Sequence, residues 1–143
     1  MERDVVLPEK DRWRYTDYLS LPPDSSGYQI IRGELILTPS PKPSHQRVVG
    51  RLFRLIDDNV THNGLGEVYI APLDVILDAQ SPDLENIVQP DFLFAAEDRL
   101  HIITDDNVQG APDLVVEILS RPTARYDWVN KLNIYREFSA GSY

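Results

Sequence analysis

Three short apolar runs limit the fold of this chain more than any other feature of its sequence. They read "EVYIAPLDVIL" (67–77), "IVQPDFLFAA" (87–96) and "APDLVVEILS" (111–120). All three are rich in the β-branched and aromatic residues that favour strands. The sequence therefore predicts three buried β-strands. Each run also contains at least one carboxylate among its apolar residues, and burying one without a partner is costly. The acids in question are Asp74, Asp91 and Glu117.

A hairpin and three helices are expected around these strands. The stretch 28–40 reads as two strands joined at Arg32-Gly33, and Ser44 is expected to cap a helix whose apolar stripe extends to Val60. Thr16 is expected to cap a short helix that ends before Pro22. A last helix is expected over 125–138, with Trp128, Leu132 and Tyr135 on one side. The order hairpin, helix, three strands and helix indicates a mixed α/β domain.

The bulk properties of the sequence fit one compact domain. Its 143 residues divide into an N-terminal arm and short helix (1–27) and a main domain (28–143). Cysteine is absent, which excludes disulfides and thiolate metal sites. No secretory signal and no apolar run of membrane-spanning length is present, so no membrane association and a cytoplasmic location are expected. The net charge of −9, from 14 Lys and Arg against 23 acids, argues against a broad basic surface.

Asp91 and Glu117 are the strongest candidates for a chemical site. If their strands are neighbours, the two side chains can converge at one point on the sheet. Two adjacent buried carboxylates repel each other, and a divalent cation such as Mg²⁺ or Mn²⁺ would relieve that repulsion. Lys131 adds a positive charge from the following helix. Two acids and a lysine around an ion suit phosphodiester hydrolysis. Structural pairing of each acid with an arginine is the alternative.

Several segments resemble a known family of endonucleases. They are "YQIIRGELILTPSPKPSHQRVVGRL", "VQPDFLF" and "GAPDLVVEILSRPT", followed by an aspartate, a lysine and a tyrosine. In this order they resemble the Uma-two family of the PD-(D/E)XK restriction-endonuclease-like superfamily. The resemblance implies a restriction-endonuclease-like α-β-β-β-α core with an N-terminal β-hairpin and a divalent metal at the sheet. Relatives continue into a further strand after the "AG" segment, so the last core strand is expected to be missing and the sequence to be truncated at its C-terminus.

The resemblance also implies roles for individual residues. Asp91 and Glu117 match the two metal-binding catalytic acids of the motif, but Leu119 stands where the motif has lysine, and Lys131 is the expected replacement. Glu34 matches an additional acid of many relatives. The auxiliary candidates that the resemblance implies are His45 and Gln46, which match the family's "HQ". Asp74 is a further candidate because it lies in an apolar strand, where it can line the site or accept hydrogen bonds from strand-end amides.

Simpler structural roles compete with some of these assignments. Glu34 can be a solvated hairpin residue, and His45 a surface residue of its helix. Asp127 can pair with Lys131, Asp113 can cap the third strand, and Tyr135 can belong to the core.

The sequence therefore predicts a metal-dependent endonuclease that cuts nucleic acid, with DNA as the expected substrate. The first alternative is a catalytically inactive interaction module with the same fold, which the acidic composition favours. A metal-dependent hydrolase of a smaller phosphate-containing substrate is the other. A homodimer would supply two sites for cutting both strands of a duplex. Arg125 and Trp128 are candidates for holding the strand.

Overall fold

The computed structural model describes residues 11–22, 27–38, 40–119 and 124–138, with the backbone alone described for 124–127. It contains three α-helices, one 3₁₀-helix and eight strands within these ranges. The elements are α1 (Tyr15–Leu19), β1 (Gly27–Ile31), β2 (Glu34–Thr38), α2 (Pro43–His62), β3 (Gly66–Ile70), β4 (Val75–Ile76), β5 (Ile87–Val88), β6 (Phe92–Ala96), η1 (Glu97–Ile102), β7 (Val108–Gln109), β8 (Leu114–Val116) and α3 (Ala124–Phe138).

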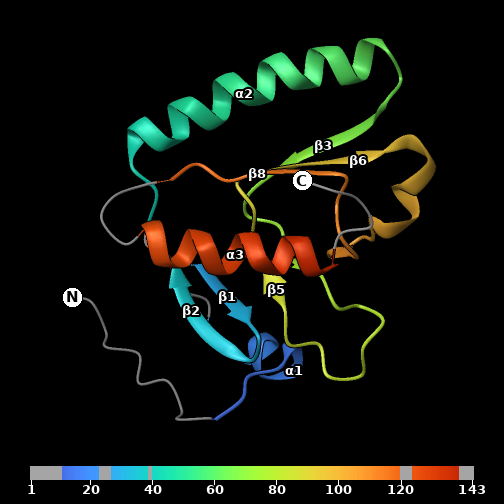
Figure 1. Ribbon diagram of the computed structural model, residues 1–143. Helices are drawn as coiled ribbons and strands as arrows, with labels where there is room; N and C mark the ends of the chain where they lie inside the picture. Colours follow the sequence, from blue (N-terminus) through green and yellow to red (C-terminus); the bar gives the residue numbers. More distant parts are fainter. Residues whose placement is uncertain (1–10, 23–26, 39, 120–123, 139–143) are drawn as a thin grey trace.

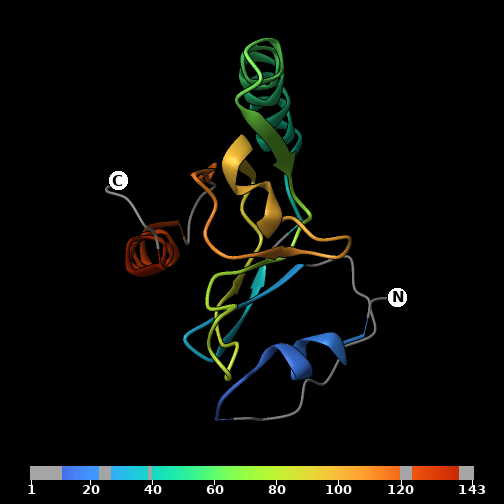
Figure 2. The same cartoon turned by 90° about the vertical axis from the view of Figure 1, so that its right-hand side faces the viewer.

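The strands form two sheets, and the helices lie on different sides of them. One sheet has the order β2-β1-β5-β4-β7 and the other has the order β3-β6-β8. All strand pairs are antiparallel except β4 with β7. Helix α2 lies beyond the three-stranded sheet at one end of the molecule, α1 lies at the opposite end, and α3 crosses one face (Figures 1 and 2). The mixed α/β fold expected from the sequence is confirmed.

The expected long strands are divided between the two sheets, which the sequence analysis did not foresee. The first run splits at Pro72 into β3 and β4, and the second splits at Pro90 into β5 and β6. In the described part of the third run (111–119), the strand is Leu114–Val116, which follows Pro112. Proline lacks the N–H that a sheet ladder needs, so a strand tends to stop where it occurs. An aspartate follows each of these prolines within two residues: Asp74, Asp91 and Asp113.

The β1–β2 hairpin has the turn that its sequence predicts. Arg32 and Gly33 both have positive φ, 51° and 79°, as expected for a two-residue turn whose twist matches the strands. Ile31 pairs with Glu34 directly across the turn. A Cβ at Gly33 would lie 2.8 Å from Cγ of Arg12, so the close approach of the N-terminal segment also requires glycine here.

Helix α2 differs from its expected form at its start and on its surface. The N-cap is Lys42 and Pro43 occupies the first turn, so the expected cap at Ser44 is wrong. Val49 and Val60 are buried. The apolar stripe is covered only in part, because Val48 and Leu55 remain 43% and 70% exposed. The expected cap at Thr16 is also wrong: α1 begins at Tyr15 and its N-cap is Arg14.

Two apolar clusters form the core. The larger lies between the sheets and α3, which contributes Ile134 and Tyr135, whereas Trp128 is 43% exposed and does not share the expected buried side. In the smaller cluster Trp13, Ile30 and Ile87 hold the segment before α1 against the five-stranded sheet. Of the expected N-terminal arm, the part from Asp11 onward is therefore packed against the sheet, and residues 1–10 lie outside the described ranges.

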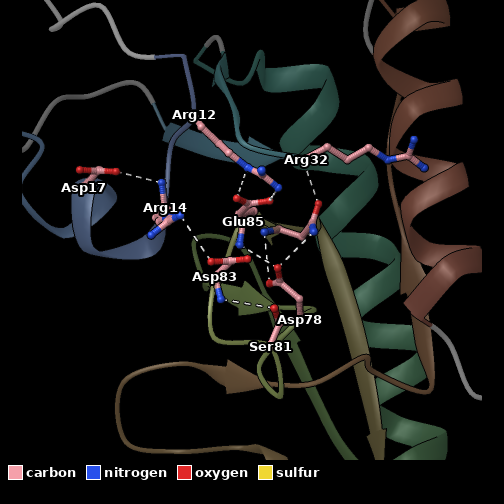
Figure 3. Close-up of polar contacts among 9 residues, drawn as sticks. Arg12, Arg14, Asp17, Arg32, Asp78, Ser81, Asp83 and Glu85 are labelled. Carbon is pink, nitrogen blue, oxygen red and sulfur yellow. Dashed lines mark hydrogen bonds and ion pairs between the residues drawn. The ribbon is translucent and has the colours of Figure 1, made fainter.

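A polar cluster also fixes the N-terminal segment (Figure 3). Arg12 pairs with Glu85, and Arg14 lies 3.4 Å from Asp83. Asp78 accepts hydrogen bonds from the backbone N–H of Glu85 at 2.7 Å, and from the backbone N–H and side-chain amide of Asn86 at 3.2 Å each. The buried acids of this loop are therefore bound by several donors.

None of the helices in the described part of the protein is both long and apolar enough to cross a membrane.

Candidate active site

Asp91 and Glu117 face each other across neighbouring strands. Strands β6 and β8 are antiparallel neighbours, with Phe92 paired to Val116. Continuing this register by one residue places Asp91 opposite Glu117, just beyond the ends of both strands. Directly opposite residues of an antiparallel pair project from the same face of the sheet. The adjacency that the sequence analysis required is present.

Asp91 is held by the neighbouring strand and by a helix. Its Oδ2 accepts a hydrogen bond from the backbone N–H of Ile118 at 2.7 Å. Its Oδ1 lies 3.1 Å from Nε2 of His45, in the first turn of α2. The side chains of His45 and Asp91 are only 14% and 16% exposed. The structure thus places His45 beside Asp91, and not on an open surface.

Glu117 is contacted by two residues one turn apart on α3. Nζ of Lys131 donates to Oε1 of Glu117 at 2.9 Å, and the hydroxyl of Tyr135 donates to the same oxygen at 2.8 Å. The side chains of Lys131 and Glu117 are 14% and 18% exposed. Residues four apart on a helix face the same way, so α3 presents both donors to one carboxylate.

The surroundings of Glu117 raise its pKa. Burial is the main cause, because it disfavours the charged form, and the negative charge of Asp91 acts in the same direction. The charge and hydrogen bond of Lys131 and the hydrogen bond of Tyr135 oppose this rise without cancelling it. The two acids therefore interact electrostatically, but Lys131 lowers the pKa of Glu117 by more than Asp91 raises it, and burial keeps the pKa raised.

The remaining predicted residues lie outside this group. Glu34 is exposed at the start of β2 and lines a hollow that also contains Asn130, the residue before Lys131. None of the described contacts joins Glu34 to Asp91 or Glu117. Gln46 is exposed on α2. The catalytic roles assigned to these residues remain predictions.

Asp74 has partners at a different place in the fold. Its Oδ1 accepts hydrogen bonds from the hydroxyl of Tyr18 at 2.7 Å and the amide of Gln89 at 2.8 Å. Burial and the neighbouring carboxylate raise the pKa of the Tyr18 phenol. These contacts join α1 to the five-stranded sheet.

Asp113 behaves as a structural residue just before β8. Its Oδ2 accepts the backbone N–H of Ala96 at 2.8 Å, and its Oδ1 lies 3.1 Å from Arg99. The expected pairing of Asp127 with Lys131, and the candidate role of Arg125, lie outside the side chains that the structure describes.

Two features of the site were not recognised from the sequence. Tyr135 was assigned to the core, and it is buried, but its hydroxyl also bonds to Glu117. The spacing of Lys131 and Tyr135 was the signal that could have revealed this. Nδ1 of His45 is buried without a hydrogen-bond partner among the described residues, and such atoms are unusual away from functional sites.

The two carboxylates are suitable ligands for a hard divalent cation. Mg²⁺ is commonly held by one or two carboxylates, with water and substrate phosphates completing its coordination. Both described hydrogen bonds to Glu117 end on Oε1, which leaves Oε2 for a metal. Within the described ranges, no three His, Cys, Asp or Glu side chains gather closely enough to hold a metal by themselves. The arrangement therefore fits an ion that has coordination positions left for water and substrate.

Comparisons with known proteins agree on the fold and the family. The family model described as "Uma2: Putative restriction endonuclease" matches residues 15–143. A crystal structure of "a putative nuclease belonging to DUF820" from Anabaena variabilis is similar, with a TM-score of 0.71 and 17% sequence identity over 87% of this chain and 68% of that one. No curated protein matches the sequence. With a nuclease-type fold and a family match over most of its length, the chain belongs to the Uma2 family of restriction-endonuclease-like proteins.

Proposed function

We propose that this protein is a metal-dependent endonuclease that hydrolyses phosphodiester bonds of nucleic acid, with DNA as its substrate. Family membership supports a nuclease-like function in general. The observation that carries the proposal is the cross-strand placement of Asp91 and Glu117, with Lys131 2.9 Å from Glu117. Acids and a lysine in this arrangement can hold a cation and stabilise the charge that develops on a phosphate.

In the proposed mechanism Asp91 and Glu117 hold Mg²⁺ or Mn²⁺, which when bound supplies a Lewis acid and an activated water. The amide of Ile118 and the ring of His45 orient Asp91. Tyr135 orients Glu117 through its hydrogen bond. Lys131 provides a positive charge beside the reacting phosphate.

The raised pKa of Glu117 fits this assignment. A carboxylate must be ionised to bind a metal, so binding to this site should weaken in acid. Lys131 keeps the carboxylate available by lowering its pKa against the effect of burial. A carboxylate whose pKa is shifted by burial and by a charged partner is a common mark of a functional site.

The auxiliary candidates differ in their support. His45 contacts Asp91 directly, and we assign it a positioning role. Glu34 lies along the hollow beside Asn130, and we retain it as an assisting acid. Gln46 adjoins His45 in the first turn of α2. The contacts of Asp74 with Tyr18 and Gln89 favour a structural role for that residue.

A second candidate function is a non-catalytic interaction module. The net charge of −9 and the lack of a third acidic or histidine ligand among the described residues favour this alternative. Such a protein would keep the fold without binding metal. A measurement of metal binding therefore separates the two functions.

The test is Mn²⁺ titration calorimetry followed by a plasmid-nicking assay, on the wild type and the Glu117→Gln variant. We expect saturable binding that the variant loses, and nicking that is at least about 100-fold slower in the variant. Glu137→Gln is the matched control, because Glu137 is an exposed glutamate on α3 that pairs with Arg32 and contacts neither Asp91 nor Glu117. Wild type that binds no Mn²⁺ would support the interaction module, and binding without nicking would support a hydrolase of smaller phosphates.

A further inference from the structure

The outer face of α2 carries three arginines that have no acidic partner among the described residues. Arg47, Arg51 and Arg54 are all exposed, and their spacing of four and three residues places them along one side of the helix. The buried side of the same helix carries Val49 and Val60. None of the three arginines forms an ion pair with a described residue.

Five other Lys and Arg side chains of the described residues are already bound to acids, whereas the exposed Lys42 and Arg136 form no ion pair with a described residue. The ion pairs join Arg12 to Glu85, Arg14 to Asp83, Arg32 to Glu137, Arg99 to Asp113 and Lys131 to Glu117. Arg47, Arg51 and Arg54 differ from the other unpaired cations of the described residues because they lie together on one side of one helix.

The local charge around these arginines is opposite to that of the whole protein. No acid occurs between Lys42 and Arg54, although the sequence has 23 acids and only 14 Lys and Arg. The first acids of the helix are Asp57, which accepts a hydrogen bond from Thr61 at 3.2 Å, and Asp58. The N-terminal part of a helix also carries a partial positive charge. A polyanion would meet an attractive surface here.

Along the axis of α2 this surface starts close to the candidate active site, and it lies on the side of the helix that faces away from His45. His45, two residues before Arg47, contacts Asp91. At a rise of 1.5 Å per residue, Arg47, Arg51 and Arg54 lie about 3 to 14 Å beyond His45 along the helix axis. They span about 10 Å, which corresponds to about three base-pair steps along the axis of a duplex at about 3.4 Å each. Helix α2 lies at one end of the molecule (Figure 2), so its outer face is accessible to a long ligand.

We propose that Arg47, Arg51 and Arg54 form a stripe that binds the sugar-phosphate backbone of the nucleic acid leading away from the active site. This proposal rests on the proposed endonuclease function, and it identifies the surface that would bind the nucleic-acid substrate. Arginine suits this task because its planar guanidinium can bind phosphate through two hydrogen bonds. The stripe also explains how an acidic protein can bind a polyanion, since the binding needs local positive charge only.

The test is fluorescence anisotropy with a labelled 30-base-pair duplex in EDTA, at 50 to 200 mM salt. The Arg47→Gln/Arg51→Gln/Arg54→Gln variant should lose about 0.9 in the slope of log K against log salt for each arginine. Across this range the wild-type affinity should therefore fall about 40-fold more than that of the variant. An unchanged slope in the variant overturns the proposal.

A control variant removes the same total charge elsewhere. Arg14→Gln/Arg32→Gln/Arg136→Gln changes three exposed arginines and should keep the wild-type slope. An equal loss in this control would mean that net charge alone drives binding, which overturns the stripe. Competition by polyglutamate or phosphatidylserine vesicles as strong as that by DNA would assign the surface to an acidic protein or a membrane, and would also overturn it.

The proposal and the endonuclease function can fail separately. If the wild type nicks plasmid but the stripe variant shows no change of salt slope, the stripe proposal is rejected and the endonuclease function is retained. If the stripe arginines contribute to DNA binding but the wild type does not nick DNA with Mn²⁺, the endonuclease function is rejected and the stripe proposal is retained.

Discussion

Two regions of the molecule withdraw acidic side chains from solvent, and they handle the charge differently. In the loop around Asp78 and Glu85, several donors surround the carboxylates: Arg12 pairs with Glu85, and three N–H groups reach Asp78 (Figure 3). Buried polar groups that are bound in this way stabilise a fold. This loop fastens the N-terminal segment to the five-stranded sheet.

The region around Asp91 and Glu117 brings two carboxylates together instead. Burial and the neighbouring acid raise the pKa of Glu117 in spite of Lys131 and Tyr135. A carboxylate within apolar sequence is therefore no sign of function by itself, since the structural Asp78 is also buried, at 8% exposed. The candidate site differs from the structural cluster in two respects. Its two acids, Asp91 and Glu117, lie opposite each other on neighbouring strands, and the ammonium group of Lys131 on α3 pairs with Glu117.

The largest effect on stability is expected from the structural cluster. Asp78→Ala leaves two backbone N–H groups and one side-chain amide without their acceptor, which should lower the free energy of unfolding by about 3 kcal/mol. Thermal unfolding followed by circular dichroism should show a midpoint about 10 °C lower. Asp78→Asn keeps one acceptor oxygen and should lose less, and folded Asp78→Ala should still bind Mn²⁺. Loss of Mn²⁺ binding by the folded variant would contradict the purely structural role assigned to the Asp78 cluster.

Replacement of Lys131 should affect the site and not the fold as a whole. Lys131→Met should slow nicking about 100-fold, because the charge that stabilises the reacting phosphate is removed. The pKa of Glu117 should also rise, since Lys131 lowers it, so the pH midpoint of Mn²⁺ binding should move upward. Calorimetry at a series of pH values measures this shift. Lys131→Arg keeps the charge and should shift the midpoint less, and an unmoved midpoint in Lys131→Met would show that the ammonium does not control Glu117.

The smallest effect concerns pH and stability at Glu117. Because its pKa is raised on folding, the folded state binds this proton more tightly than the unfolded state does. The associated stability is complete below the unfolded pKa near 4.5 and is lost as the pH rises through the folded value. Glu117→Gln, which is neutral at every pH, should therefore unfold at a higher temperature than the wild type at pH 7, with the difference vanishing below about pH 4.5. A less stable variant at pH 7 would mean that pairing with Lys131 outweighs the burial of Glu117.

Much of the architecture could be predicted from local features. The Arg32-Gly33 turn depends on two adjacent residues. That α2 and α3 are helices follows from apolar residues that recur every three or four positions. The meeting of Asp91 with Glu117 followed from strand alternation and the assumption that their strands are neighbours. The resemblance of short segments to the Uma-two family pointed to the same acids.

The tertiary structure decided the features that depend on distant partners. Whether an apolar run stays in one sheet or changes sheet at Pro72 or Pro90 depends on which strands are available for pairing. The exposure of Val48, Leu55 and Trp128 depends on what packs beside their helices. Caps were misplaced at Thr16 and Ser44 because neighbouring residues offer nearly equivalent starts.

The sequence by itself determined the classes of element, the fold class and the acids worth considering, because propensity and periodicity act over a few residues. Only the folded protein decided how each buried charge is bound. Glu117 receives its donors from Lys131 and Tyr135, 14 and 18 residues away, and Arg12 reaches Glu85 across 73 residues. Which of these donors approaches which acid depends on the packing of whole elements, and that packing is a property of the complete fold and not of any short segment.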